Sequence, residues 1–233
     1  MHKLDRARVA APACLSNYDY ETQTWDDFGS DCKKELRKQL GSMQGRRVPG
    51  SEDHVINLRC AYCEEEIFSR EGSRHGHIEH FRRKNPVCGF PQLTFSWENL
   101  FLSCDSQDHC GHFKDSKGAS VYNPDSLIKP DETDPDDLLF FHSNGIVRPR
   151  EGLTGDDQNR ANETINTFNL NEPALKGKRA KAVGSYLKRV KSDLEEIASW
   201  NEKDRQDFFR QEIEETCWDS FATTIRHFFQ RAG

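Results

Sequence analysis

The chain has 233 residues, of which 34% are hydrophobic and 31% are charged, and its 33 basic and 39 acidic side chains give a formal charge of −6. No stretch approaches the roughly 18 consecutive apolar residues that a membrane-spanning helix needs, and Met1–Asp5 does not open a secretory signal peptide. This composition argues against a membrane protein, a secreted protein, a collagen-like repeat and wholesale disorder, so we expect a globular protein of the cytoplasm.

Charge is segregated along the chain, although its sum is acidic. Residues 33–47 carry six Lys and Arg side chains against one Glu, and residues 176–191 carry seven without an acid. Residues 125–137 are acidic instead. A chain of this kind can present a basic face to a partner despite its net charge.

The first half of the chain has little regular periodicity. Residues 1–30 predict an irregular arm with little structure of its own. Residues 31–41 predict a short helix with an acidic start and a terminating Gly41. Residues 56–120 hold short strand-like runs and most of the Cys and His residues, but few long apolar periods. That combination is typical of a module held together by a metal ion.

The second half predicts a hairpin followed by helices. Leu138–Phe141 and Ile146–Val147 flank Asn144-Gly145, a dipeptide that favours a tight hairpin turn. From about residue 156, apolar residues recur at intervals of three and four, which indicates amphipathic helices. We expect two apolar stripes that pack together: Val183, Leu187, Val190, Leu194 and Ile197 in one helix, and Phe209, Ile213, Cys217 or Trp218, Phe221, Ile225 and Phe228 in the last.

The predicted fold is therefore α+β and mainly helical, in four segments. These are an N-terminal arm with a short helix at 1–54, a metal-stapled module at 55–120, a hairpin connection at 121–155 and a helical region at 156–233.

The cysteines predict a zinc site. Without a secretory signal, eight cysteines favour metal ligation or buried thiols over disulfides. Cys60 and Cys63 form a C-x2-C pair, and Cys104 and Cys110 form a second, wider pair. Two such pairs can place four thiolates around Zn²⁺ at about 2.3 Å. A redox-active C-x2-C is the alternative, but the chain lacks the βαβ pattern that such a motif needs.

The remaining cysteines have less defined roles. Cys88 and His109 are alternative ligands for the same ion. Cys14, Cys32 and Cys217 have no ligand-like neighbours, and we expect them to be small apolar side chains.

A second series of motifs lies around and between the two Cys pairs. The sequence reads Cys-Ala-Tyr-Cys-Glu, then Glu-His-Phe-Arg-x-Lys, then Trp-Glu-Asn-Leu-x-Leu-Ser-Cys, then Cys-Gly-x-x-Lys. This order resembles the HNH, or ββα-metal, nucleases, and most closely the PtuB-like HNH subunits of bacterial Septu and retron anti-phage systems. The resemblance covers roughly residues 55–180. Arg83 stands where the family often has proline, which affects a turn and a local charge.

The resemblance implies a fold, an activity and partners. It implies a ββα-metal module stapled by the four-cysteine zinc site, and metal-dependent hydrolysis of phosphodiester bonds in DNA or RNA. It also implies an ATPase partner of the ATP-binding-cassette or SMC-like type, and contact with retron RNA or DNA through the complex. A zinc-stapled nucleic-acid-binding or scaffolding subunit without catalysis is the alternative.

The motifs also imply roles for individual residues. His80 is the expected general base, because a neutral imidazole with a pKa near ~6.5 suits proton transfer at cytoplasmic pH. Glu79 and His112 are expected to hold one Mg²⁺ or Mn²⁺, with His77 as the alternative to Glu79. Asn99 is expected to orient His80 by bonding backbone across the hairpin. The residues expected to contact nucleic acid are Arg82, Arg83 and Lys114.

Regulation is expected to come from outside the chain. No G-x4-G-K-[ST] motif occurs, so ATP is not read here through a P-loop. The C-terminal helices and the arm, with its aromatic residues Tyr18, Tyr20, Trp25 and Phe28, are candidate docking elements for the ATPase. The alternative is that the arm folds back over the core of this chain.

Overall fold

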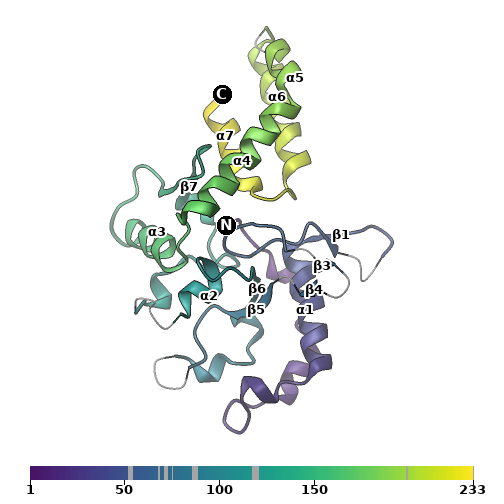
Figure 1. The fold of residues 1–233 in the computed structure, drawn as a ribbon, viewed down its shortest axis with the longest axis vertical. Helices are drawn as coiled ribbons and strands as arrows, with labels where there is room; N and C mark the ends of the chain where they lie inside the picture. The colour runs from purple at the N-terminus through teal and green to yellow at the C-terminus, as the bar shows by residue number, and fades with distance from the viewer. Residues whose placement is uncertain are drawn as a thin grey trace.

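The structure is a computed structural model that describes residues 1–51, 55–67, 69–70, 73–74, 76–85, 89–116, 121–197 and 199–232. Figure 1 shows a body of short strands and helices, from which C-terminal helices rise. The α+β class expected from the sequence is confirmed. His54, His75 and Cys88 lie outside the described residues.

Helix α1, Ser30–Gln44, begins one residue before the predicted helix and runs past Gly41. Cys32, Leu36, Leu40 and Met43 are buried at helical spacing, so the apolar stripe continues beyond the glycine that was expected to end it. The helix ends at Gly45 instead.

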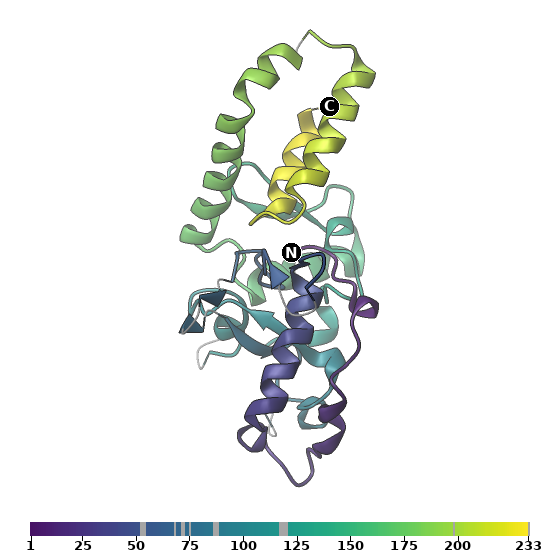
Figure 2. The same cartoon turned by 90° about the vertical axis from the view of Figure 1, so that its right-hand side faces the viewer.

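The N-terminal arm packs on the body and belongs to the core. It forms three 3₁₀ turns, at Arg6–Arg8, Ala13–Asn17 and Trp25–Asp27. Leu4 and Phe28 are each 2% exposed, and the Leu4 N–H donates to the Pro130 carbonyl at 2.8 Å. Figure 2 shows the purple arm running beside α1. Of the two alternatives for the arm, the structure therefore has it folded over its own chain.

A disulfide joins the arm to α1. It links Cys14 to Cys32. The expectation that these two cysteines are isolated thiols was wrong, because their spacing of 18 residues spans a turn of the arm that brings them together.

Within the described residues, the strands form four antiparallel pairs. They are β1 (Arg46–Arg47) with β2 (Val55–Ile56), β3 (Ser69–Arg70) with β4 (Ser73–Arg74), β5 (His77–His80) with β6 (Leu100–Ser103), and β7 (Leu139–Phe141) with β8 (Val147–Pro149). The central pair places His77 opposite Ser103 and His80 opposite Leu100. All of β6 is buried, and helix α2, Cys110–Lys114, follows it.

One large apolar core includes side chains from each of the four predicted segments. Leu36 of α1, Phe101 of β6, Leu139 of β7 and Phe168, which follows helix α3 (Gly155–Thr167), are all fully buried in it. The segment boundaries themselves stay a prediction.

The C-terminal helices are α4 (Pro173–Arg189), α5 (Lys191–Ile197), α6 (Glu202–Thr216) and α7 (Ala222–Ala232). A second, smaller apolar cluster holds them together, and its members are Val183, Tyr186, Val190, Ile225 and Phe229, with Leu187, Phe209, Ile213 and Phe228 packed against them. This confirms that the two stripes pack against each other. No described helix is long and apolar enough to cross a membrane.

The last predicted helix is broken in two. The chain leaves α6 after Thr216, and Phe221 adopts a left-handed φ of 61° before α7 starts. This turn sends Phe221 into the main core rather than into the smaller cluster. The side chain of Leu194 lies outside the described part of the chain.

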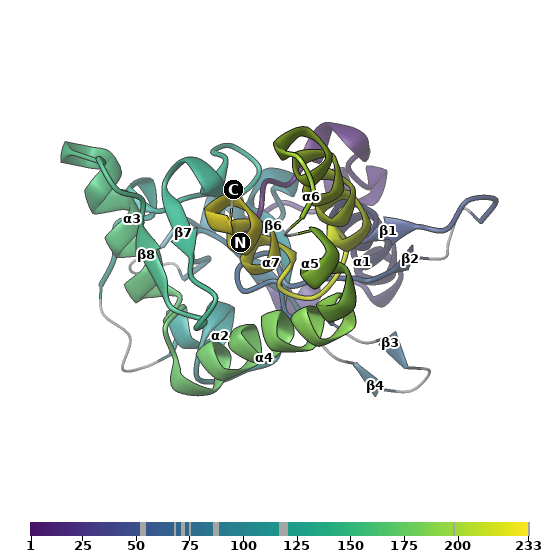
Figure 3. The ribbon, with the colours of Figure 1, turned by 90° about the horizontal axis from the view of Figure 1, so that it is seen from above.

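The β7–β8 hairpin is confirmed, with its turn at Asn144-Gly145. Gly145 has a φ of 85°, and its N–H donates to the His142 carbonyl at 2.8 Å. A Cβ at this position would collide with the backbone carbonyl of Lys176 in α4. Figure 3 shows the tip of the hairpin beside α4. Gly145 is thus needed both for its backbone conformation and for close helix packing.

We predict that Gly145→Ala destabilises the chain more than Gly152→Ala. Both glycines have a positive φ, 85° and 82°, but a Cβ at Gly152 meets nothing within 4 Å. Gly152→Ala should therefore cost about 1 kcal/mol from backbone strain alone, and Gly145→Ala at least ~2 kcal/mol more from the collision. Urea denaturation at pH 7 measures both losses, and equal losses would contradict the close packing of hairpin and helix.

Candidate metal and catalytic centre

Four buried cysteines form the first cluster. Cys60 and Cys63 come from a turn after β2, Cys104 follows β6, and Cys110 begins α2. Their sulfur atoms all lie within 4.8 Å of one another, and those of Cys63 and Cys104 are 3.9 Å apart. Zinc with four bonds of about 2.3 Å separates its sulfur ligands by about 3.8 Å. The cluster can hold a metal ion, and its geometry fits a structural zinc.

His109 lies beside this cluster. The side chain is 3% exposed, and its Nδ1 lies 3.2 Å from the sulfur of Cys110 and 3.7 Å from that of Cys104. His109 was predicted only as an alternative ligand. Because four sulfurs already surround the position for an ion, the ring is better placed to donate an N–H to a thiolate.

Strand β5 separates the predicted catalytic residues between its two faces, because successive side chains alternate. His77 and Glu79 share one face, where the His77 Nε2 and Glu79 Oε2 are 3.2 Å apart. His80 points to the other face, toward Trp25 and Thr94. The structure thus brings His77 to Glu79 but gives the His80 ring different neighbours.

Glu79 is held by an ion pair. Its Oε1 lies 2.8 Å from the Lys114 Nζ, and the two side chains are 5% and 0% exposed. Burial alone would raise the pKa of Glu79, but the charge of Lys114 and the contact with His77 outweigh it and lower the pKa to about 2. Glu79 is therefore ionised near neutral pH.

Gly111 allows α2 to approach this carboxylate. A Cβ at Gly111 would lie 2.5 Å from the Glu79 Oε2 and 2.9 Å from the His77 Nε2. The glycine of the Cys-Gly-x-x-Lys motif is thus explained by close packing of the helix on β5.

Lys114 does not lie where the sequence analysis expected it. Its Nζ also donates to the His80 carbonyl at 3.0 Å and to the Asp115 Oδ1 at 2.7 Å. A fully buried ammonium with these partners joins α2 to β5 and does not reach phosphate at the surface. The expectation is corrected accordingly, since the charge of Glu79 draws the lysine inward.

Arg82 and Arg83 remain partly accessible. Their side chains are 27% and 25% exposed, and each pairs with an acid, Asp125 for Arg82 and Asp115 for Arg83. Surface ion pairs of this kind are weak and can exchange partners.

A second cluster of metal-ligating groups lies at the surface. It consists of His77, Asp105 and His112, whose ligand atoms all lie within 4.8 Å of one another. The two imidazole rings stack with centroids 3.9 Å apart, and the Asp105 Oδ1 lies 3.4 Å from the His77 Nδ1. Of the predicted ligands, His112 and the alternative His77 belong to this cluster, whereas Glu79 does not. Asp105 was not predicted, because its only signal in the sequence is an acid directly after Cys104.

His80 is held as a neutral ring. Its Nε2 lies 3.0 Å from the Thr94 carbonyl, so this nitrogen carries the proton and the lone pair is on Nδ1. Burial, together with the charge of Lys84, lowers the pKa of His80 to about 4. The Trp25 ring packs edge-on at 4.5 Å. Neither the contact with Trp25 nor the contact with Thr94 was predicted, because both residues reach His80 only through tertiary folding.

Asn99 bonds backbone across the hairpin. Its Oδ1 accepts from the Arg82 N–H at 2.8 Å, and its Nδ2 donates to the carbonyls of Arg82 and Leu93 at 3.0 and 3.1 Å. These bonds tie the end of β5 to the loop that presents Thr94. The contacts are those that the orienting role requires, and the role itself stays a prediction.

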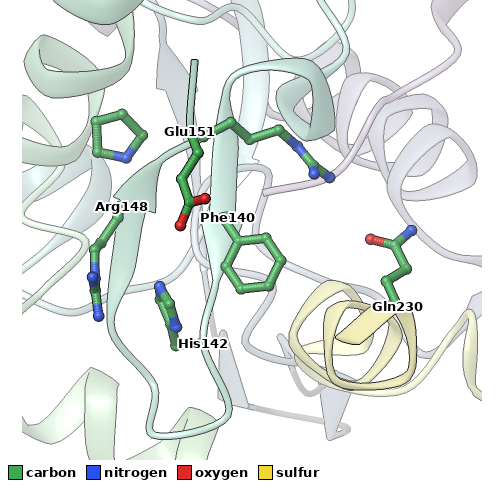
Figure 4. A pocket seen from close by; sticks show the side chains of 7 residues that line it. Phe140, His142, Arg148, Glu151 and Gln230 are labelled. Atoms are coloured by element: carbon green, nitrogen blue, oxygen red, sulfur yellow. The ribbon is translucent and has the colours of Figure 1, made fainter. Parts of the chain in front are cut away.

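A separate pocket of about 330 Å³ lies between the β7–β8 hairpin and α7. Figure 4 shows Phe140, His142, Arg148, Glu151 and Gln230 around it. It contains none of the predicted site residues.

Comparison with known proteins supports the resemblance seen in the motifs. No family model matches the chain. The chain is 25% identical over 209 residues to the Septu protein PtuB of Bacillus mycoides (strain KBAB4), a match that covers 78% of this chain and 68% of the relative. It is 24% identical over 204 residues to a protein named as a candidate HNH endonuclease of retron Vc95 from Vibrio cholerae serotype O1 biovar El Tor, covering 81% and 87%. The predicted relation to PtuB-like HNH proteins is thereby confirmed.

We predict that Cys104→Ser removes the metal of the four-cysteine cluster and unfolds the surrounding module. Structural zinc can contribute on the order of 10 kcal/mol to such a module. Elemental analysis after dialysis should find one zinc per wild-type chain and less than half of that in the variant, with a lower melting temperature. The control is Cys217→Ser, since Cys217 is exposed and lies outside the cluster. A wild-type chain without zinc would contradict the assignment.

Proposed function

We propose that this relative of PtuB is a metal-dependent HNH nuclease, which hydrolyses phosphodiester bonds as the effector of an anti-phage defence complex. The observation that carries the proposal is the arrangement around β5. A neutral, buried His80 lies on one face, and the His77–Asp105–His112 cluster extends from the other. The names of the two relatives support the same activity.

Hydrolysis needs a base for the attacking water and a positive charge near the phosphate. His80 supplies the base: its Nε2–H is committed to the Thr94 carbonyl, which leaves the Nδ1 lone pair to take a proton. Its low pKa keeps the ring neutral at pH 7. Asn99 is a positioning residue that holds the backbone on both sides of this contact.

His77, Asp105 and His112 are the residues that would hold Mg²⁺ or Mn²⁺. When bound, the ion supplies Lewis-acid neutralisation of the phosphate oxygens. Glu79, which was expected to bind the ion, instead contacts a ligand of the ion, because its Oε2 faces the His77 Nε2. If Glu79 accepts that N–H, the His77 Nδ1, which faces Asp105, is left as the ligand atom.

The four-cysteine cluster is adjacent in sequence to two members of the His77–Asp105–His112 cluster. Asp105 directly follows Cys104, and His112 lies two residues after Cys110. A structural zinc would thus fix both residues through the backbone. The strand–strand–helix order of β5, β6 and α2 supports the proposed ββα-metal module.

The partners follow from the resemblance and from the accessible charges. Arg82 and Arg83 are placed to exchange their acidic partners for phosphate of the nucleic-acid substrate. An ATP-binding-cassette or SMC-like ATPase would hold the nuclease in check, with retron RNA or DNA reaching it through the complex.

The test of the proposed base is His80→Ala. We expect cleavage of plasmid DNA or RNA, with Mn²⁺ or Mg²⁺, to fall by 10²- to 10⁴-fold while zinc content stays unchanged. The assay uses the complex co-purified from the native operon, with EDTA as the blank. His142→Ala, in the separate pocket of Figure 4, is the matched control and should cleave normally. Wild-type cleavage by His80→Ala would exclude His80 as the base, and no cleavage by the wild-type complex would favour a binding or scaffolding subunit.

The test of the proposed ion site is Asp105→Asn. Loss of one carboxylate ligand should raise the Mn²⁺ concentration that gives half-maximal cleavage by about 10-fold or more. Asp108→Asn changes an exposed acid in the same loop outside the cluster and should leave that concentration unchanged. An equal response of the two variants would show that Asp105 does not bind the ion.

A further inference from the structure

We propose that the pocket beside His80 binds an unpaired base of the nucleic-acid substrate. This inference rests on the proposed nuclease function and adds the form of substrate that the site accepts. The pocket has a volume of about 670 Å³ and lies between the N-terminal arm and the segment that follows β5. Its size falls within the roughly 300–1,000 Å³ of small-ligand sites.

The pocket is continuous with the surroundings of the candidate base. Two of its lining residues, Trp25 and Thr94, also contact the His80 ring. The Trp25 ring lies 4.5 Å from the imidazole, and the Thr94 carbonyl accepts from its Nε2 at 3.0 Å. A nucleotide in this pocket would therefore have its phosphate close to His80.

One wall of the pocket is aromatic. Tyr20 is 43% exposed, and it is one of the few large hydrophobic side chains that the described residues leave open to solvent. Trp25 also lines the pocket and packs on Phe28 at 4.7 Å and on His80 at 4.5 Å. Aromatic side chains of this kind suit stacking of a planar base.

The facing wall is basic at its rim. Lys84 is exposed and has no ion pair within the described part of the chain, and Arg83 is 25% exposed. Asp26 and Asp115 also line the pocket, and the charge of Asp115 is already matched by Arg83 and Lys114. Aromatic faces combined with an unpaired cation, which here is Lys84, are features that bind single-stranded nucleic acid.

A pocket that binds a base by stacking on an aromatic side chain selects against an intact duplex. In a duplex both faces of each base are covered by its neighbours, so a base reaches an aromatic wall only when it is unpaired or flipped out. The proposed preference is therefore for single-stranded or locally opened nucleic acid. It gives the arm a role in substrate binding, although the arm lies outside the strand–strand–helix module.

The experiment measures binding without cleavage. Fluorescence anisotropy without added Mg²⁺ or Mn²⁺ compares a labelled 20-nucleotide single strand, as DNA and as RNA, with the blunt duplex of the same sequence, on the co-purified complex. We expect the wild type to bind at least one single strand about 5-fold or more tightly than the duplex. Tyr20→Ala should weaken single-strand binding by about 5-fold or more and leave duplex binding unchanged, since stacking on one aromatic ring is worth that much.

Matched variants separate stacking from folding and from catalysis. Tyr20→Phe keeps the ring and should bind as the wild type does. Lys84→Gln should weaken both substrates, whereas Lys188→Gln, at an exposed position on α4, should weaken neither. Because binding is measured without cleavage, a failure of the proposed base leaves this result intact. The inference is overturned if Tyr20→Ala binds the single strand normally, or if the wild type shows no preference for it.

Discussion

The ion pair between Glu79 and Lys114 joins strand β5, which carries the expected base His80, to helix α2, which carries His112. Both side chains are buried, at 5% and 0% exposure, and the lysine also holds the His80 carbonyl. Removing one partner of such a pair leaves an uncompensated charge and costs roughly 3–5 kcal/mol. The pair thereby fixes how closely α2 approaches β5, and Gly111 provides the space for that approach.

The turn that carries the first two cysteines also anchors the C-terminal helices. Glu64 follows Cys63, and its carboxylate accepts from the Thr223 backbone N–H at 3.0 Å in the first turn of α7. A carboxylate at this end of a helix is stabilised by the unpaired N–H groups and the helix dipole. The Phe221 N–H donates to the Glu64 carbonyl at 3.2 Å. The candidate zinc site and the helical region are therefore linked through one residue.

Local spacing explains what could be predicted from the sequence. The C-x2-C pair, the Asn144-Gly145 turn and the apolar stripes are each encoded within a few residues, and the structure brings their members together. The four cysteines could be grouped because sulfur ligands have few other roles at that spacing. His77 and His112 could be named because the order of the motifs along the chain can be recognised without knowing which side chains contact one another.

What escaped prediction depends on contacts between distant segments. Asp105 became part of a cluster only because β5 and α2 lie on either side of it. Lys114 reads as a surface cation in sequence, and its burial depends on a carboxylate 35 positions away on a different element. The disulfide of Cys14 with Cys32 and the contact of Trp25 with His80 likewise follow from how the arm folds back.

The separation of the two apolar cores has a consequence for how the molecule opens. Leu175 near the start of α4 belongs to the large core, whereas Val183 and Tyr186 of the same helix belong to the small one. The small core has few members, so local unfolding of α5 and α6 requires less free energy than global unfolding, whereas Thr223 and His227 bond α7 to the body. A ligand that binds only the ordered form of these helices would shift that opening equilibrium. The helical region could then act as an adjustable cooperative unit, while Leu175 keeps the start of α4 fixed to the body.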